Sequence, residues 1–560
     1  MIVDDLVAWL ADGLSAAAPG LGLDDDGLPV PEFHAPKQKE HGDFATNVAL
    51  ALAARAGRPP REVAQALVAA LPPAPFVEKV EIAGPGFINV FTTDAWLHDA
   101  LRAIAATGPD HGRRASTGER VQVEFVSANP TGPLTIGHAR NAVIGDSLAR
   151  LLAFAGHEVE REYYFNDAGG QMDRFGASVE ARYLELVGRE ATVPEDGYHG
   201  EYVRAYAADI LATEGPALAD LPAEERFRRL RAEGAARAMA EIRETLARFG
   251  VVFDTFVSEA SLQDKGEIAE AIARLQAAGA AYEAEDAVWF RSTDFGDDKD
   301  RVLVRTNGQH TYFAADCAYV IDKFARGFDH LIYVWGADHH GDIARVKGAT
   351  RVLGFDPERV ELLIYQFVTF LRGGEPVKMS KRAGTFVTLA DLIDEVGADA
   401  ARFHLLLFSN DHPMNFDIEV VKRQTMDNPV YYVQYGHARI ASILRKAAES
   451  GVVLAPIAEV DLGPLRHEAE IDLLRALASV PAELEKAAAL RAPHRLTHLA
   501  QDVAARFHRF YTECRVVSED AATTQARLWL CRGAKQVLAN LLDLVGVGAP
   551  ERMDREDVGG

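Results

Sequence analysis

The sequence predicts an α/β protein with a doubly wound parallel sheet at its centre, a small N-terminal α/β domain and an all-helical C-terminal bundle. Three observations predict this fold class. Short apolar strands alternate with helices through the middle of the chain, a hairpin pattern precedes them, and helical periodicity replaces strand patterns after about residue 425. A chain of 560 residues is also long enough for three or more folding units.

The central region repeats a strand, a turn and a helix. The strand pattern VQVEFVSA is followed by a helix with one apolar face that closes at Gly156, and EVEREYYF is the next strand. Further along, HLIYVW and ELLIYQFV are continuous apolar runs, which is typical of strands buried on both faces. Such alternation indicates a parallel, Rossmann-like sheet.

The composition changes along the chain and predicts three domains. We expect an N-terminal α/β domain over 1–112, a parallel-sheet domain over 113–425 and a helical domain over 426–560. A charged, alanine-rich stretch at about 180–290 is expected to be a helical insertion in the sheet domain, which ends in a loop region over about 373–425.

Charge and cysteine content exclude some classes of protein. The net charge of −24 argues against a protein that coats nucleic acid non-specifically, although a selective RNA binder can gather its basic residues on one face. No apolar run approaches a membrane span, and the start of the chain lacks the basic region of a signal peptide. Cys317, Cys514 and Cys531 are too few and too scattered for a disulfide framework or a zinc site, so we expect a reducing, cytoplasmic location.

A short turn between the first central strand and its helix contains Thr135, Gly137 and His138. The glycine allows close approach of a phosphate to the backbone, the helix N-terminus favours an anion, and the histidine can donate hydrogen bonds. By itself, this pattern also fits an ordinary strand-to-helix turn with a surface histidine.

A second basic motif follows the glycine turn at Gly373. It reads Lys378-Met379-Ser380-Lys381-Arg382, and its lysines could neutralise a departing pyrophosphate. Alone, this segment also fits a solvated basic loop.

The two motifs together resemble the paired signatures of class I aminoacyl-tRNA synthetases, in the expected order. Thr135 stands where the first signature has a histidine, and Arg382 replaces the last serine of the second. The resemblance implies ATP as substrate, with Mg²⁺ held mainly by the nucleotide and no protein-bound zinc. It also implies His138, Lys378 and Lys381 as catalytic residues. The implied ATP-binding residues are Thr135, Gly137, His138, Lys378, Met379, Ser380 and Lys381.

Other segments resemble arginyl-tRNA synthetases in particular, over nearly the whole chain. These segments are His41–Asn47, Pro85–Asn89, Tyr163–Gln171 with Gly170 as a departure, Thr311–Asp316, Gly336–Gly341 and Asn428–Ile440. The likeness is weakest across 180–290. It implies that the N-terminal domain contacts the tRNA elbow and that the helical domain reads anticodon bases.

The resemblance also implies an arginine-binding set, because carboxylates match the planar donor fork of a guanidinium. The residues concerned are Asn129, Asn166, Gln171, Tyr312, Asp316 and Asp338. Other interpretations remain open here: Tyr312 and Asp316 could be a helix-surface pair, and Asn166 could belong to a simple turn.

We therefore expect ATP-dependent attachment of L-arginine to tRNA(Arg) through an arginyl-adenylate, with release of AMP and pyrophosphate, by a cytoplasmic monomer without a membrane partner. Three alternatives stay open. They are a catalytically impaired tRNA-binding paralogue, a class I synthetase for another amino acid, and a small-molecule nucleotidyltransferase that shares the sheet fold.

Overall fold

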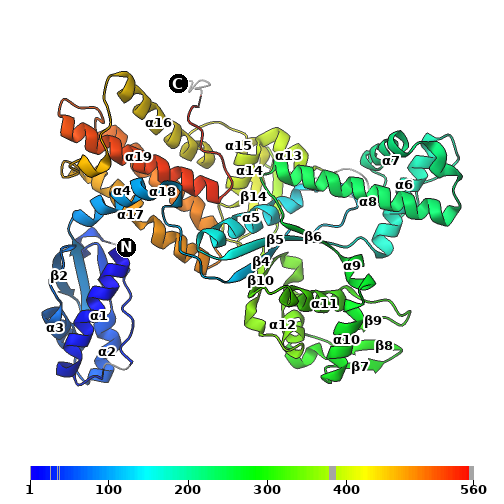
Figure 1. The fold of residues 1–560 in the computed structure, drawn as a ribbon, viewed down its shortest axis with the longest axis horizontal. Helices are drawn as coiled ribbons and strands as arrows, with labels where there is room; N and C mark the ends of the chain where they lie inside the picture. Colours follow the sequence, from blue (N-terminus) through cyan, green and yellow to red (C-terminus); the bar gives the residue numbers. More distant parts are fainter. Residues whose placement is uncertain (1, 25–26, 35, 37, 378–385, 554–560) are drawn as a thin grey trace. The chain divides into compact units, whose positions relative to one another are not determined.

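The structure is a computed structural model that describes residues 2–24, 27–34, 36, 38–377 and 386–553 (Figure 1). It contains two compact units. Unit 1 comprises Met1–His111, Arg439–Ala482 and Asp502–Val537. Unit 2 comprises Gly112–Ala438, Glu483–Gln501 and Leu538–Gly560.

The N-terminal part of unit 1 is a small α/β layer. An antiparallel sheet in the order β1-β3-β2 shares an apolar core with α1, α2 and α3. The bounds are α1 Ile2–Leu21, β1 Phe44–Thr46, α2 Val48–Ala56, α3 Pro60–Ala70, β2 Val77–Ala83 and β3 Phe87–Thr92. The expected hairpin is present, and its turn contains Gly84 and Gly86, both at positive φ.

Helices make up the rest of unit 1. They are α4 (Ala95–Thr107), most of α16 (Pro429–Glu449) and of α17 (Glu468–Ala489), and the larger parts of α18 (His494–Glu513) and α19 (Ala521–Leu544). A Cβ at Gly533 of α19 would lie 2.5 Å from Leu101 of α4, so the glycine permits close helix packing. The described part of the chain contains no strand after β14 (Met414–Asp417), as the sequence predicted.

The centre of unit 2 is a five-stranded, fully parallel sheet in the order β11-β10-β4-β5-β6. Its strands are β4 Arg120–Glu124, β5 Glu158–Phe165, β6 Thr255–Ser258, β10 His330–Gly336 and β11 Val360–Tyr365. The strand order reverses between β4 and β10. In sheets of this kind ligands bind at the carboxyl ends of the strands beside such a reversal.

Helices cover both faces of this sheet. Glu124 of β4 contacts α11 (Tyr312–Ala325), whereas Phe125 packs against Gly145 of α5 (Ala139–Phe154). Successive side chains of an extended strand point to opposite faces, so α5 and α11 lie on opposite sides. The doubly wound arrangement predicted from the sequence is confirmed.

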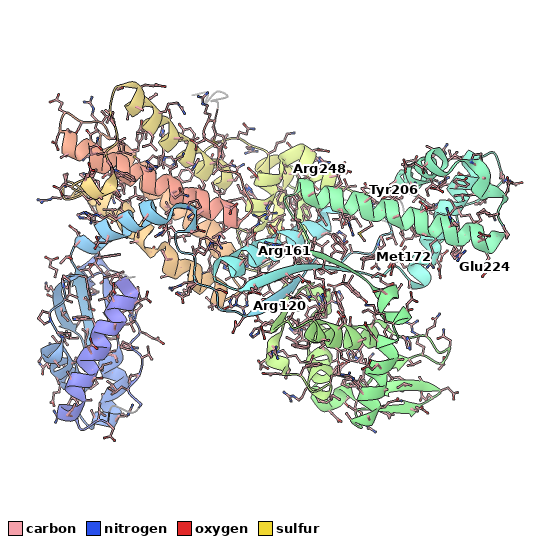
Figure 2. The ribbon with its side chains drawn as sticks, in the orientation of Figure 1. Arg120, Arg161, Met172, Tyr206, Glu224 and Arg248 are labelled. Atoms are coloured by element: carbon pink, nitrogen blue, oxygen red, sulfur yellow. The ribbon has the colours of Figure 1, made fainter. Side chains whose placement is uncertain are left out.

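Between β5 and β10 the chain makes two additions to the sheet. The first is helical, with α6 (Gly169–Leu186), α7 (Glu201–Glu214) and α8 (Ala223–Arg248); Figure 2 shows Glu224 and Arg248 at the two ends of α8. The second contains α9 (Glu259–Asp264), α10 (Glu267–Ala277) and an antiparallel sheet of β7 (Ala281–Ala284), β8 (Ala287–Phe290) and β9 (Arg301–Val304). The stretch 180–290, expected to be helical, therefore also holds strands β6, β7 and β8.

The remaining elements of unit 2 follow β10. They are α12 (Ile343–Val352), β12 (Val368–Arg372), β13 (Glu375–Pro376), α13 (Leu389–Val396), α14 (Ala398–Leu405), β14 and α15 (Ile418–Val421). β12 pairs with β13 and β14 in a small mixed sheet.

A fully buried cation fixes several segments of unit 2 to one another. Arg402 of α14 is 0% exposed and donates to the Val545 carbonyl at 2.9 Å, to the Phe249 carbonyl at 2.9 Å and to Asp146 of α5 at 2.5 Å. A Cβ at Gly546 would overlap its guanidinium, so only a glycine fits there. We call Arg402, Asp146 and the two carbonyls the Arg402 cluster.

Candidate active site

The chain leaves β4 through a strained turn. Val126 and Ser127 have φ of 66° and 43°, a left-handed conformation that costs side-chain-bearing residues about 1–3 kcal/mol each. Asn141 holds the turn: its Oδ1 accepts from the Val126 amide at 2.6 Å, and its Nδ2 donates to the Val334 carbonyl at 2.8 Å. The turn therefore joins β4 to β10 at the strand-order reversal.

The turn with Thr135, Gly137 and His138 lies directly before α5, as expected. The Thr135 amide donates to His138 Nδ1 at 3.2 Å, and the two residues form a capping box. His138 Nδ1 also lies 3.2 Å from Thr135 Oγ1 and 3.3 Å from the Thr135 carbonyl oxygen, so Thr135 holds the Nδ1 side of the ring. Among the described residues, a Cβ at Gly137 would meet only Thr135 Oγ1, at 3.5 Å, so this part of the chain leaves the backbone there open to a ligand.

The second motif lies outside the described residues: this applies to Lys378, Met379, Ser380 and Lys381. The segment that follows it is described and pairs with the first motif. The Ile136 amide donates to the Val387 carbonyl at 3.2 Å, and the Leu389 amide donates to the Leu134 carbonyl at 2.8 Å. The carboxyl side of the second motif is thus tied to the Thr135–His138 turn.

A pocket of about 230 Å³ opens beside this turn. It is lined by residues from the turn and from the start of the helical insertion: Ser127, Ala128, Asn129, Thr131, Gly132, Pro133, Leu134, His138, Gln171, Tyr198, Tyr202 and Phe386. Three of the predicted site residues, Asn129, His138 and Gln171, thus share one pocket.

Side-chain amides connect the ends of β4 and β5. Asn129 Nδ2 donates to Gln171 Oε1 at 2.7 Å, and Asn129 Oδ1 accepts from the Asn166 amide at 3.1 Å. Asn166 Oδ1 in turn accepts from the Ala168 amide at 2.9 Å. The structure therefore brings the three predicted amide residues together, with Asn166 almost fully buried.

Asp316 lies on α11 beside other carboxylates. Its pKa is raised to about 7, mainly by burial and then by Glu124 and Glu259, while Arg345 and His339 act in the opposite direction. Two members of the predicted set are exposed: Tyr312 is the first residue of α11, one helical turn before Asp316, and Asp338 lies in the short turn after β10. The neighbouring acidic groups make the Asp316 position favourable for a cation.

Two of these neighbours are themselves fixed. Glu259 is 6% exposed and accepts from the Tyr164 hydroxyl at 2.8 Å, and burial raises its pKa. Glu124 accepts from Ser127 Oγ at 3.1 Å, which links the acidic cluster to the residues of the pocket.

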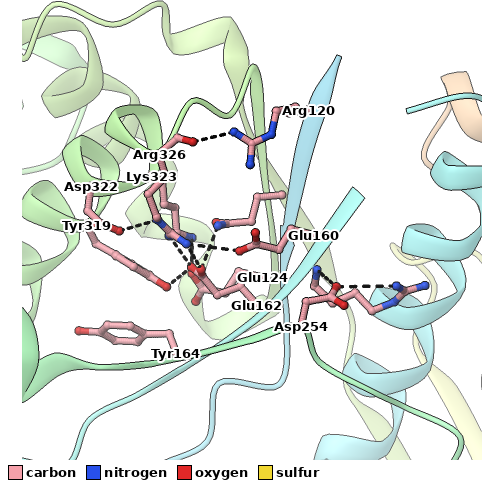
Figure 3. Close-up of polar contacts among 12 residues, drawn as sticks. Arg120, Glu124, Glu160, Glu162, Tyr164, Asp254, Tyr319, Asp322, Lys323 and Arg326 are labelled. Atoms are coloured by element: carbon pink, nitrogen blue, oxygen red, sulfur yellow. Dashed lines mark hydrogen bonds and ion pairs between the residues drawn. The ribbon is translucent and has the colours of Figure 1, made fainter. Parts of the chain in front are cut away.

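A buried ionic layer lies behind Glu124. Figure 3 shows residues of α11 that converge on Glu124 and Glu162, which are paired neighbours on β4 and β5. Lys323 Nζ lies 2.6 Å from Glu124 and 3.6 Å from Glu162, and Arg326 lies 2.6 Å from Glu162. Tyr319 also donates to Glu162. We call Glu124, Glu162, Tyr319, Lys323 and Arg326 the Lys323 cluster.

The sequence interpretation did not single out Glu124 or Glu259. A signal for Glu124 was present, because a carboxylate within the apolar strand pattern VQVEFV has to find a partner or a function. Glu259 gave no such signal, since it lies at the start of a short helix where acidic residues are common.

This arrangement suits two kinds of ligand at once. The Thr135–His138 turn presents a helix N-terminus and an imidazole N–H, which favour phosphate. The Asp316–Glu124–Glu259 group presents carboxylates, which favour a cation such as a guanidinium. Among the described residues, no group of three or more His, Cys, Asp or Glu could hold a metal ion, and none of the helices there has the length and apolarity to cross a membrane.

Comparison with known proteins agrees with this geometry. The family model for the catalytic domain of class I tRNA synthetases (R) matches residues 101–417 and thus defines the class of the sheet domain. The models for the arginyl tRNA synthetase N terminal domain and the DALR anticodon binding domain match residues 9–92 and 433–553.

Curated relatives match over nearly the full length. The arginine–tRNA ligase of Moorella thermoacetica is 48% identical, with 98% of each chain covered, and that of Desulforamulus reducens is 47% identical, with 99% of this chain and 100% of the relative covered. The solved structure of Thermus thermophilus arginyl-tRNA synthetase shares the fold, with a TM-score of 0.76, 24% identity and 99% and 100% coverage. The chain belongs to the arginyl-tRNA synthetase family.

Proposed function

We propose that this chain attaches L-arginine to tRNA(Arg) in two steps, with an arginyl-adenylate as the intermediate. The arginine carboxylate attacks the α-phosphorus of ATP and pyrophosphate leaves. The acyl group then passes to a ribose hydroxyl at the tRNA 3′ end and AMP leaves. The observation that carries the proposal is the acidic group around Asp316, which is linked through Glu124 and Ser127 to the pocket beside a phosphate-type turn.

In the proposed complex, the substrate guanidinium binds Asp316, with Glu124 and Glu259 adding negative potential around it. Tyr312 is one helical turn from Asp316 on α11 and can pack over the bound side chain. Asn129, Asn166 and Gln171 hold the α-amino and carboxylate end, and Asp338 adds a further carboxylate near the site. A pocket with several polar requirements rejects analogues that leave its groups unpaired.

His138 donates to a phosphate oxygen of ATP from Nε2 in this proposal, because the Nδ1 side of the ring lies against Thr135. Thr135 and Gly137 offer a hydroxyl and an open backbone to the same nucleotide. We assign Lys378 and Lys381, with Met379 and Ser380, to the departing pyrophosphate. The pairing of Val387 and Leu389 with the Thr135–His138 turn supports this assignment. Mg²⁺ accompanies the nucleotide and shares its charge.

The proposal divides the chain into three functional parts. Residues 1–112 contact tRNA outside the anticodon, 113–425 carry catalysis, and 426–560 bind the anticodon. We also propose that the protein acts as a monomer in the cytoplasm, which the family resemblance supports. Gel filtration with light scattering tests the first of these two statements.

The test of the proposed function is aminoacylation of total tRNA with ATP, Mg²⁺ and a panel of labelled amino acids, followed by sequencing of the charged tRNA. We expect arginine alone to be attached, and only to tRNA(Arg). Charging with a different amino acid supports a class I synthetase of another specificity. Binding of tRNA without any charging or ATP–pyrophosphate exchange supports the paralogue without catalysis, and arginine-dependent exchange excludes it. Amino-acid activation with no RNA partner supports the nucleotidyltransferase.

A further inference from the structure

The buried lysine of α11 occupies an uncommon position. Lys323 is 1% exposed, and its ammonium lies 4.2 Å from the ring centre of Tyr319 and 4.0 Å from that of Tyr333. Lysines are almost never fully buried unless they are paired. The cost of burying this one is offset by two aromatic faces and by two carboxylates.

Those carboxylates would repel each other without it. Glu124 and Glu162 are directly paired in the parallel register of β4 and β5, where like charges destabilise a sheet. Lys323 lies between them, closer to Glu124 than to Glu162 (Figure 3). Glu162 has other donors, since Arg326, Tyr319 and Gln122 all bond to it.

The partners of Glu124 are fewer. Among the described residues, its donors are Lys323 Nζ to Oε2 and Ser127 Oγ to Oε1, so each carboxylate oxygen has its own partner. Burial raises the pKa of Glu124, and Lys323 is the largest influence that lowers it. Ser127 and Lys323 therefore fix the direction of this carboxylate, and Lys323 is the main group that favours its charged form.

We infer that Lys323 is a positioning residue for substrate: its ion pair holds Glu124 charged and in place, so that Glu124 adds negative potential to the site where Asp316 receives the guanidinium. The inference rests on the proposed function and deepens it. Lys323 touches no substrate in this arrangement and acts through Glu124. It compensates one carboxylate of the pair, while Asp316 keeps its charge for the incoming cation.

The other charged groups around the pair come from several elements. Glu124 faces Glu162 of β5, Tyr319 of α11 and Tyr333 of β10. Among the described residues, the charged or titratable groups near Asp316 include Glu259 of α9, Arg345 of α12, His339 of the turn after β10, Tyr164 of β5, Tyr333 and Cys317 of α11. Of these, Arg345 and His339 favour the ionised form of Asp316, and the carboxylates oppose it.

The test compares Lys323→Met with Arg326→Met in tRNA aminoacylation by the full chain. Both residues lie close to Glu162, but Lys323 also pairs with Glu124. In Lys323→Met the pKa of the acid limb in the pH profile of kcat/KM for arginine should rise by about one to three units. This limb reports ionisation of the Glu124–Asp316 pair. Where the pKa of this limb lies above the pH of the assay, KM for arginine should rise about tenfold for each pH unit between the two values. KM for ATP should stay within about twofold.

Arg326→Met controls for a purely structural role. It should lower thermal stability about as much as Lys323→Met, but it should shift the acid limb and KM for arginine by clearly less, because Arg326 pairs with Glu162 and not with Glu124. An unchanged limb in folded Lys323→Met would overturn the inference, as would an equal shift in both variants. Failure of the unmodified protein to charge tRNA with arginine is a different result, because it removes the proposed function itself.

A second variant decides the matter if Lys323→Met does not fold. Glu162→Gln keeps the shape of the side chain but removes its negative charge. Lys323 then pairs with Glu124 alone, and the positive charges of the Lys323 cluster are in excess. The acid limb should then move to lower pH, by less than the rise in Lys323→Met. No shift, or a shift to higher pH, contradicts the role given to Lys323.

Discussion

Unit 2 buries the cations Arg402 and Lys323, and their surroundings differ. The guanidinium of Arg402 donates to two backbone carbonyls and to Asp146, which also accepts from Arg150 at 2.8 Å. The polar groups of the Arg402 cluster thus bond to one another. The partners of Arg402 come from α5, the end of α8 and the segment after α19. The Lys323 cluster lies beside Asp316, a carboxylate whose pKa is raised by the other acidic groups around it.

The difference shows how the same interaction can serve two purposes. Removing one partner of a buried ion pair is costly wherever it occurs, because it leaves an uncompensated charge. In the Arg402 cluster the buried ion pair holds chain segments together. In the Lys323 cluster the ion pair also keeps a carboxylate charged next to the proposed guanidinium site. Four predictions test this distinction.

Arg402→Met should have the largest effect. Asp146 loses its most buried partner and two carbonyls lose a donor, so the free energy of unfolding should fall by about 3–5 kcal/mol. Urea unfolding followed by circular dichroism measures this change, and arginine KM of the folded fraction should not move. Arg506→Met is the matched control, because its pair with Asp502 is exposed and contributes about 0.5 kcal/mol. Equal loss in both variants would contradict the structural role of the Arg402 cluster.

Asp316→Asn should affect activity and not stability. Loss of the charged partner of the guanidinium should lower kcat/KM for arginine ~150-fold, which corresponds to about 3 kcal/mol of lost binding free energy in the transition state. KM for ATP should be unchanged. The folded-state pKa of Asp316 is raised, so its contribution to stability is lost as pH rises through about 7. The variant should therefore be at least as heat-stable as the unmodified protein at about pH 8. Asp322→Asn, on the same helix, is the control, and an equal loss of kcat/KM there would argue against a direct role of Asp316.

The pH dependence of arginine use should follow the same group. Below about pH 7 Asp316 takes up a proton and loses the charge that attracts a guanidinium, so kcat/KM for arginine should fall about tenfold for each pH unit. Arginine binding should accordingly release a proton, which calorimetry in buffers of different ionisation enthalpy detects. A flat profile between about pH 6 and pH 8 would exclude Asp316 as the group that binds the cation.

Thr135→Ala should have the smallest effect. The hydroxyl takes part in the capping box with His138, and loss of such a cap costs about 1 kcal/mol. We expect kcat to fall about fivefold with arginine KM unchanged, because the acidic group around Asp316 is not altered. Steady-state kinetics with saturating arginine measures this, and a rise in arginine KM instead would show that the turn and the acidic group are not separable.

Much of the fold was predictable because its signals are local. The strands around Val123 and Val334 are apolar runs bounded by turn residues, and the helices after residue 425 have regular apolar spacing. Strands β7 to β9 escaped prediction, since each is four residues long, partly exposed and embedded in a charged stretch. Length and burial produce the pattern, and these strands have little of either.

The residues of the candidate site also differ in how far local sequence reveals them. Thr135, His138 and Asp316 were identified through motifs that are contiguous in the chain. The meaning of Glu124 depends on Lys323, which lies 199 residues away, and no local pattern reports such a pairing. The left-handed backbone of Val126 was equally hidden, because a β-branched residue is among the least expected there.

The Asn141 bridge has a consequence for how the protein is made. Its side chain joins the Val126 amide to the Val334 carbonyl, 193 residues further along than Asn141 itself. On a ribosome, the N-terminal domain can fold while this carbonyl has not yet been synthesised. The Asn141 side chain can therefore bond to Val334 only after β10 has left the ribosome. For more than a third of the synthesis of the chain, the strained turn after β4 lacks this contact.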